Sequence, residues 1–126
     1  MPECLTLGET MAAFTPDRMG PLRYVQNYGI RVAGAESNTA VGLAKLGISA
    51  AWVSCLGMDE FGQYIRNQLR AEGVDCSGGE ALHFATKEEA LPTIRAQLTP
   101  QTAMLIKASH AMRFGQLVEA LQASYD

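Results

Sequence analysis

The apolar positions in the first 77 residues follow two different spacings, and each spacing predicts a different kind of element. Stretches of strand length that are rich in apolar residues predict strands, and 50–56 is mostly apolar, as expected for a strand that is covered on both faces. Apolar residues three and four positions apart predict helices between these runs. The predicted strands are 4–7, 11–14, 22–32 and 50–56, and the predicted helical stripes are Val41, Leu43, Ala44, Leu46 and Phe61, Ile65, Leu69.

Short polar residues and glycines mark the predicted ends of these helices. Ser37 and Asp59 are predicted N-caps, since a short polar side chain accepts a hydrogen bond from an early helical amide. Gly47 and Gly73 stand where a helix commonly ends with a left-handed residue. Proline and glycine between 16 and 21 predict a turn between two of the strands.

The pattern after residue 81 predicts two more helices and one strand. Thr86 and Glu89 form a capping box, in which each side chain satisfies an orphan amide of the first helical turn. Pro92 follows inside this helix, so we expect the helix to kink there or to begin near it. A buried strand is predicted over 103–108, and a final amphipathic helix over 114–121.

Strands and helices alternate along the whole chain, which favours an α/β fold with right-handed crossovers. We predict a three-layer Rossmann-like sandwich with a mostly parallel sheet. A small N-terminal lid-like β-hairpin, formed by 11–14 and 22–32, is expected beside it. Neither half of the chain can bury both faces of its part of the sheet alone. We therefore expect a single domain over 1–126, assembled from segments 1–77 and 78–126.

Composition and charge narrow the classes of function. The 126 residues carry a net charge of −3 with ten scattered Lys and Arg residues, which argues against a nucleic-acid surface. No apolar run is long enough to span a bilayer, and no signal peptide is recognised. Cys4, Cys55 and Cys76 lack the spacing of metal ligands. We expect a cytoplasmic protein with reduced thiols and no metal site.

Residues 33–57, AGAESNTAVGLAKLGISAAWVSCLG, resemble the N-terminal signature of the PfkB, or ribokinase-like, sugar kinases. A small residue and two glycines follow Asn38 at the spacing of that family. Glu36 departs from the broad family pattern, but AESN at this place is similar to the 2-keto-3-deoxygluconate kinases. GETMAAFTP and GMDEFGQYIRNQLRAEGVD resemble the same subgroup, so the resemblance covers about 4–77.

The segment over about 81–124 resembles the C-terminal end of MurF, the Mur ligase that adds D-alanyl-D-alanine to the peptidoglycan precursor. The resembling residues are LHFATKEEALPTIRAQL and AMLIKASHAMRFGQLVEAL. The MurF pattern has Lys-Gly-Ser-Arg after its strand, whereas this chain has Lys107-Ala108-Ser109-His110. The two resemblances together imply a non-homologous chimera joined near residue 78.

Neither resemblance brings a complete ATP site with it. The resembling kinases use a Gly-Ala-Gly-Asp-type motif to bind phosphate and to supply the base, and Mur ligases use a P-loop; this sequence holds neither. We therefore expect no catalytic function and no cofactor, in a chimera made or selected for folding. The alternatives are a weak sugar-acid-binding remnant of a 2-keto-3-deoxygluconate kinase and a truncated carbohydrate kinase that works with a second polypeptide.

The kinase resemblance implies residual sugar-acid contacts after the first strand and at the start of the first helix, where open α/β sheets commonly bind ligands. These candidates are Glu9, Gly34, Glu36 and Asn38. The alternative is that they only preserve a turn and a helix cap. Lys107, Ser109 and His110 are candidate anion contacts or a solvated loop, and His83 is expected at the edge of the core.

The lid strands lack the later strands with which they pair in the kinases that they resemble. Free strand edges and exposed apolar side chains invite pairing with another chain. We therefore expect a homodimer through 11–14 and 22–32, and no nucleic-acid or membrane partner. The competing outcome is that the hairpin folds back onto its own sheet.

Overall fold

The structure is a computed structural model that describes residues 2–74, 76, 86–108, 110 and 113–123. The elements in chain order are β1 (Cys4–Gly8), β2 (Met11–Pro16), the 3₁₀ helix η1 (Leu22–Tyr24), β3 (Tyr28–Ala33), α1 (Ala35–Lys45), β4 (Ala50–Val53), α2 (Glu60–Ala71), α3 (Lys87–Ala96), β5 (Ala103–Lys107) and α4 (Gly115–Gln122). No helix in these ranges is long and apolar enough to cross a membrane.

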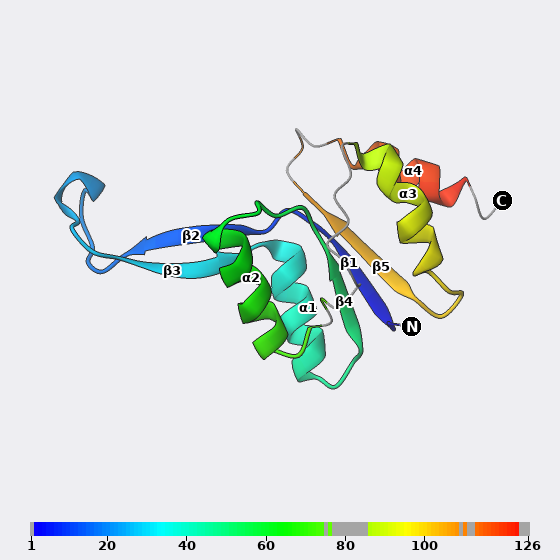
Figure 1. Cartoon of the computed structure of the whole chain (residues 1–126), viewed down its shortest axis with the longest axis horizontal. Helices are drawn as coiled ribbons and strands as arrows, with labels where there is room; N and C mark the ends of the chain where they lie inside the picture. Colours follow the sequence, from blue (N-terminus) through cyan, green and yellow to red (C-terminus); the bar gives the residue numbers. More distant parts are fainter. Residues whose placement is uncertain (1, 75, 77–85, 109, 111–112, 124–126) are drawn as a thin grey trace.

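The described strands form a parallel sheet in the order β4-β1-β5 and a separate antiparallel hairpin of β2 and β3. Helices α1 and α2 cover one face of the sheet, and α3 and α4 cover the other (Figure 1). The hairpin projects from one end of the sheet beside α2 (Figure 1). This arrangement confirms the predicted α/β fold with a parallel sheet and an N-terminal hairpin.

Two apolar clusters lie on opposite faces of the sheet because side chains alternate along β1. Leu5 and Leu7 face α3 and α4, where Ile94, Leu117 and Leu121 complete the first cluster. The second cluster joins α1, α2 and β4, and its buried members are Ala40, Ala50, Ile65, Leu69 and Val74. Thr6 is fully buried between Leu5 and Leu7 in sequence, and its hydroxyl group donates to the carbonyl oxygen of Ala51 at 3.4 Å.

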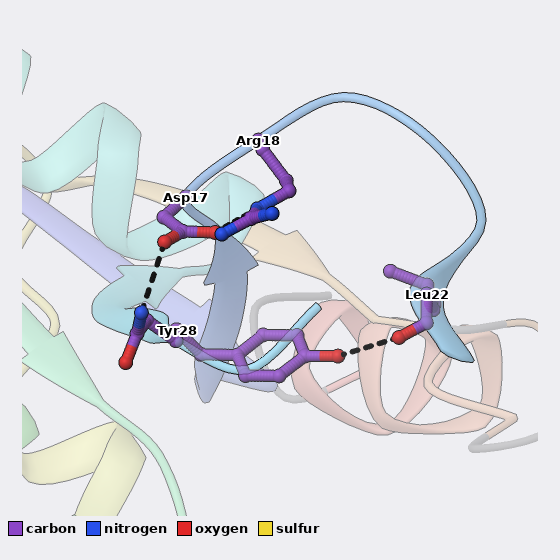
Figure 2. A network of polar contacts seen from close by, with 5 residues as sticks. Asp17, Arg18, Leu22 and Tyr28 are labelled. Atoms are coloured by element: carbon purple, nitrogen blue, oxygen red, sulfur yellow. Dashed lines mark hydrogen bonds and ion pairs between the residues drawn. The ribbon is translucent and has the colours of Figure 1, made fainter. Parts of the chain in front are cut away.

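The hairpin is shorter than predicted, because the expected strand 22–32 begins only at Tyr28. The amide groups of Tyr24 and Val25 donate to the carbonyl oxygens of Pro21 and Leu22, both at 3.0 Å, which closes η1 instead of a strand. Figure 2 shows the Tyr28 hydroxyl group donating to the Leu22 carbonyl oxygen, at 3.3 Å. Asp17 also accepts hydrogen bonds from its neighbour Arg18 and from Asn27, and the bond from Asn27 joins the two sides of the tip. An apolar run alone could not reveal this local closure.

Most predicted helix ends are confirmed. Asp59 caps α2 by accepting from the Gly62 amide at 2.9 Å, and Thr86 caps α3 by accepting from the Glu89 amide at 3.3 Å. Gly47 and Gly73 have positive φ values of 80° and 83°, as a left-handed C-terminal residue requires. Capping is local chemistry, so the sequence predicts it well.

Two predicted boundaries are wrong. Ser37 does not cap α1, because the helix already begins at Ala35 with Gly34 as its N-cap. The strand predicted over 50–56 ends at Val53, and the next hydroxyl group, on Ser54, donates to the Gly8 carbonyl oxygen at 2.9 Å. Helix α3 begins at Lys87, as the predicted cap at Thr86 requires, and Pro92 lies inside it; of the two expected alternatives, a start near Pro92 is not observed.

Candidate functional site

The carboxyl ends of the three parallel strands meet at one edge of the sheet. Gly8 in β1 pairs with Lys107 in β5, and Leu7 pairs with Val53 in β4. A Cβ atom at Gly8 would lie 2.1 Å from the Lys107 carbonyl oxygen and 2.6 Å from Cδ of Glu36. Glycine at this position therefore allows β1, β5 and the start of α1 to approach one another.

Glu36 lies in the first turn of α1, and its side chain is buried, with 1% of its surface exposed. Its Oε1 atom accepts a hydrogen bond from the hydroxyl group of Thr10, which is also buried. The Thr10 oxygen in turn accepts from Nε1 of Trp52 in β4, at 3.2 Å. These three side chains connect the turn after β1, the strand β4 and the start of α1.

The backbone at Gly34 is enclosed by polar side chains. A Cβ atom there would lie 2.7 Å from the Ser37 hydroxyl oxygen and 3.0 Å from both Glu36 Oε1 and Thr10 Oγ1. Ser37 is buried and donates to the Gly34 carbonyl oxygen at 3.1 Å. The Asn38 amide also donates to that oxygen, at 2.9 Å, as the first hydrogen bond of the helix. The amide groups before Asn38 have no carbonyl partner within the helix and give this end a partial positive charge.

The predicted contacts Glu9, Gly34, Glu36 and Asn38 do not form one cluster. Gly34 and Glu36 lie together, and Glu9 is exposed in the turn between β1 and β2. Asn38 is two residues after Glu36 and so lies on a different side of the helix. Asn38 borders a shallow groove between β3, α1 and α2, whose other lining residues are Ile30, Arg31, Val32, Val41, Tyr64, Gln68, Leu69 and Glu72.

The candidate anion contacts are only partly covered by the described residues. Lys107 is exposed at the end of β5, and His110 is also exposed. Ser109 and His83 lie outside the described residues. Among the residues that are described, no three His, Cys, Asp or Glu side chains converge as metal ligands.

Thr10 and Trp52 are the site residues that sequence reasoning missed. Trp52 lies in the predicted strand 50–56, and it packs partly against the cluster of α1 and α2. Thr10 follows the candidate Glu9 at the end of β1, which was the available signal for its position. Its partners are 26 and 42 residues away in the sequence, so no local pattern shows them.

Comparison with known proteins adds a family to this geometry. The family model described as "pfkB family carbohydrate kinase" matches residues 1–120. The chain belongs to this family.

Among the relatives of this pfkB-family chain, a 2-dehydro-3-deoxygluconokinase of Bacillus subtilis is 44% identical over 75 residues, which is 60% of this chain and 23% of the relative. A 5-dehydro-2-deoxygluconokinase of Clostridium perfringens is 31% identical over 98 residues, 72% of this chain and 29% of the relative. The matched part therefore spans about a quarter of the length of these relatives.

Two solved structures support the fold. The PfkB protein from Polaromonas sp. JS666 has 44% identity and a TM-score of 0.59, over 61% of this chain and 26% of that one. The 2-dehydro-3-deoxygluconokinase from Thermotoga maritima has a TM-score of 0.54 over 83% of this chain and 27% of that one. Its 22% identity supports the fold alone.

The comparisons do not support the predicted Mur ligase segment. The family match continues to residue 120, through most of the segment 81–124 in which we expected the MurF pattern. The resemblance to MurF rested on a helix, a strand and a second helix with few rare motifs. That succession is common to many α/β proteins, so it distinguishes families poorly. The interpretation of the chain as a chimera is likewise unsupported.

Proposed function

We propose that this pfkB-family chain binds a 2-keto-3-deoxy sugar acid at the carboxyl edge of its sheet and does not transfer phosphate by itself. The observation that carries the proposal is the 44% identity to a 2-dehydro-3-deoxygluconokinase. The close approach of β1, β5 and α1 at Gly8 and Gly34 supports it, because ligands commonly bind where parallel strands end.

Positive groups that can attract an anionic sugar acid lie at this edge, beside the carboxylates of Glu9 and Glu36. Lys107 is exposed beside Gly8 in the β1–β5 pairing, and the first amide groups of α1 point out of the helix start. Both features favour a carboxylate ligand over a neutral sugar. Phosphoryl transfer needs groups that hold and neutralise the transferred phosphate, and no Gly-x-Gly-Asp motif or P-loop occurs in the 126 residues.

The binding test is a titration with 2-keto-3-deoxygluconate followed by amide NMR. We expect saturable shifts at Gly8, Gly34 and Glu36, with a dissociation constant on the order of millimolar. Gly34→Ala places a methyl group against Ser37 and weakens binding about tenfold or more. Gly42→Ala is the matched control, because a Cβ atom there meets nothing within 4 Å. Equal binding by both variants, or no saturable shift in the wild type, contradicts the proposal.

The second half of the proposal is tested with ATP and the same sugar acid. We expect no ADP production above background by the purified chain. Turnover that Gly34→Ala abolishes would show a kinase in its own right. A kinase that is completed by a second polypeptide is the second candidate, favoured by relatives about four times as long as the matched part. In that case the sugar acid still binds, and activity appears only when the second polypeptide is added.

We also propose that the hairpin forms a homodimer. Phe14, Ile30 and Tyr28 lie on the hairpin face that α2 covers, because Phe14 pairs with Ile30 and stacks edge-on against Phe61 of α2, with ring centroids 5.6 Å apart. The hairpin tip extends beyond α2 (Figure 1), and its exposed large apolar residues are Met19, Leu22 and Tyr24. Beside α2, Phe14, Tyr28 and Ile30 remain 54%, 43% and 39% exposed. A second copy of this surface is a matching apolar partner.

Sedimentation at tens of micromolar protein tests the homodimer. We expect a dimer mass for the wild type and a monomer mass for Tyr24→Lys at the hairpin tip. Leu46→Lys is the matched control, since Leu46 is 77% exposed at the far end of α1. A monomeric wild type, or dissociation by both variants alike, contradicts this assembly.

A further inference from the structure

The hydrogen bonds of the half-buried Trp52 and the buried Thr10 and Glu36 run in one direction. An indole Nε1–H group can only donate, so the Thr10 oxygen accepts from Trp52. The single hydroxyl proton of Thr10 is therefore free to donate to Oε1 of Glu36. Thr10 therefore links β4 to the first turn of α1 by accepting one hydrogen bond and donating another.

Both ends of the Thr10–Glu36 bond lie against the backbone of Gly34. Thr10 Oγ1 and Glu36 Oε1 are each 3.0 Å from the position that a Cβ atom at Gly34 would occupy. Glu36 and Thr10 are 1% and 7% exposed, so water replaces neither partner easily. Movement of either side chain therefore changes the space around Gly34, where we place the sugar acid.

We propose that Thr10 is a positioning residue that holds Glu36 and Trp52 in place and thereby sets the backbone at Gly34 for ligand binding. The inference rests on the proposed sugar-acid site and assigns Glu36 an inward, supporting position instead of a direct sugar contact. It has a second consequence. Trp52 is the single tryptophan of the chain, so its fluorescence emission reports whether its hydrogen bond to Thr10 is intact.

The first test needs no ligand. Thr10→Val keeps the side-chain shape and removes the hydroxyl group, so we expect a shifted indole N–H resonance of Trp52, a changed emission maximum and a displaced Gly34 amide resonance. Thr10→Ser keeps the hydroxyl group and restores all three signals. Thr15→Val is the matched control, since Thr15 donates to the Gly29 carbonyl oxygen at 3.2 Å in the exposed hairpin. Wild-type signals in Thr10→Val overturn the proposal.

The second test adds 2-keto-3-deoxygluconate. We expect Thr10→Val to weaken binding about tenfold, while Thr10→Ser and Thr15→Val bind like the wild type. We also expect the ligand to change Trp52 emission in the wild type. If the wild type does not bind, the proposed function fails, while the ligand-free signals still decide the role of Thr10. If the wild type binds and Thr10→Val binds equally well, the positioning role is wrong.

Discussion

Both helical layers pack on the sheet through an apolar cluster, and the layer of α1 and α2 also has side-chain hydrogen bonds to strands. In the layer of α1 and α2, side-chain hydrogen bonds reach the strands: Thr10 joins Glu36 to Trp52, and the Tyr64 hydroxyl group donates to the Ile30 carbonyl oxygen at 2.9 Å. In the layer of α3 and α4, an apolar cluster built on Leu5 and Leu7 makes the contact with the sheet.

The polar bonds of the second layer run between its own helices. Arg95 donates to the Ala120 carbonyl oxygen at 2.8 Å, and Lys87 donates to Oε1 of Gln116 at 2.8 Å. Apolar contact is non-directional, whereas hydrogen bonds require particular partners at particular angles. The first layer is therefore the one that can hold the backbone at Gly34, where we propose that a ligand binds, in a defined position, and the second mainly supports the sheet.

Removing a buried leucine from each layer tests whether the layers unfold together. Leu69→Ala in α2 and Leu117→Ala in α4 each remove a nearly fully buried side chain, so we expect losses of about 2–5 kcal/mol in the free energy of unfolding. If the chain is one cooperative unit, the urea midpoint is lowered in both variants, and within each variant Trp52 emission and far-UV circular dichroism give the same midpoint. A Trp52 transition that moves only with Leu69→Ala shows two independent layers.

A methyl group added at Gly8, where β1, β5 and the start of α1 approach one another, is expected to lower the free energy of unfolding by a smaller amount. Gly8→Ala presses a Cβ atom against the Lys107 carbonyl oxygen, which cannot move without opening the β1–β5 pairing. We expect a loss of about 1–3 kcal/mol. Gly42→Ala, in the open part of α1, is expected to have the opposite sign and to stabilise by about 0.5–1 kcal/mol. Equal urea midpoints for the two variants contradict this geometry.

The two confirmed N-caps allow the stability contributed by a single hydrogen bond to be compared between the two layers. Asp59→Ala removes a 2.9 Å bond at the start of α2, and we expect a cost of about 1 kcal/mol. Thr86→Ala removes a 3.3 Å bond at the start of α3, so its cost is expected to be smaller. Thermal unfolding of both variants measures the difference. A larger loss of stability in Thr86→Ala than in Asp59→Ala contradicts this order.

The smallest expected effect is a pH dependence at the first strand. Burial raises the pKa of the Cys4 thiol, because desolvation disfavours the thiolate. The pKa of this thiol is higher in the folded state than in the unfolded state. The free energy of unfolding therefore keeps its full value below the unfolded-state pKa and falls as the pH rises above about 9, where the unfolded chain ionises first. Cys4→Ser is expected to flatten this alkaline fall in urea midpoints, and an unchanged profile rules out Cys4 as its source.

The fold could be predicted wherever the signal was local. The apolar runs around β1 and β5, the caps at Asp59 and Thr86 and the glycine at 47 depend on neighbours a few residues away. The first part of the predicted strand 22–32 is wrong, because the amide groups of Tyr24 and Val25 and the Tyr28 hydroxyl group close a turn on the carbonyl oxygens of Pro21 and Leu22, whereas its second part is confirmed as β3. Apolar content alone does not separate these two conformations.

The candidate site was predicted only in part for the same physical reason. The motif around Gly34 and Glu36 indicated the right turn, but whether Glu36 points inward depends on Thr10, which is distant in the sequence. The role of Trp52 depends on the same hydroxyl group. Long-range hydrogen bonds follow from the finished fold, so a sequence pattern cannot specify them in advance.

The central position of β1 has a consequence for synthesis on the ribosome. The Thr102 hydroxyl group donates to the carbonyl oxygen of Pro2, 100 positions earlier in the chain, next to the pairing of Cys4 with Ala103. At about 5–20 residues per second, the ribosome needs roughly 5–20 s to make the residues between them. During that time β1 can pair with β4, while the edge that later pairs with β5 has unpaired backbone groups that can bind another strand. Until β5 is made, this edge of β1 is a place where non-native strand pairing can occur.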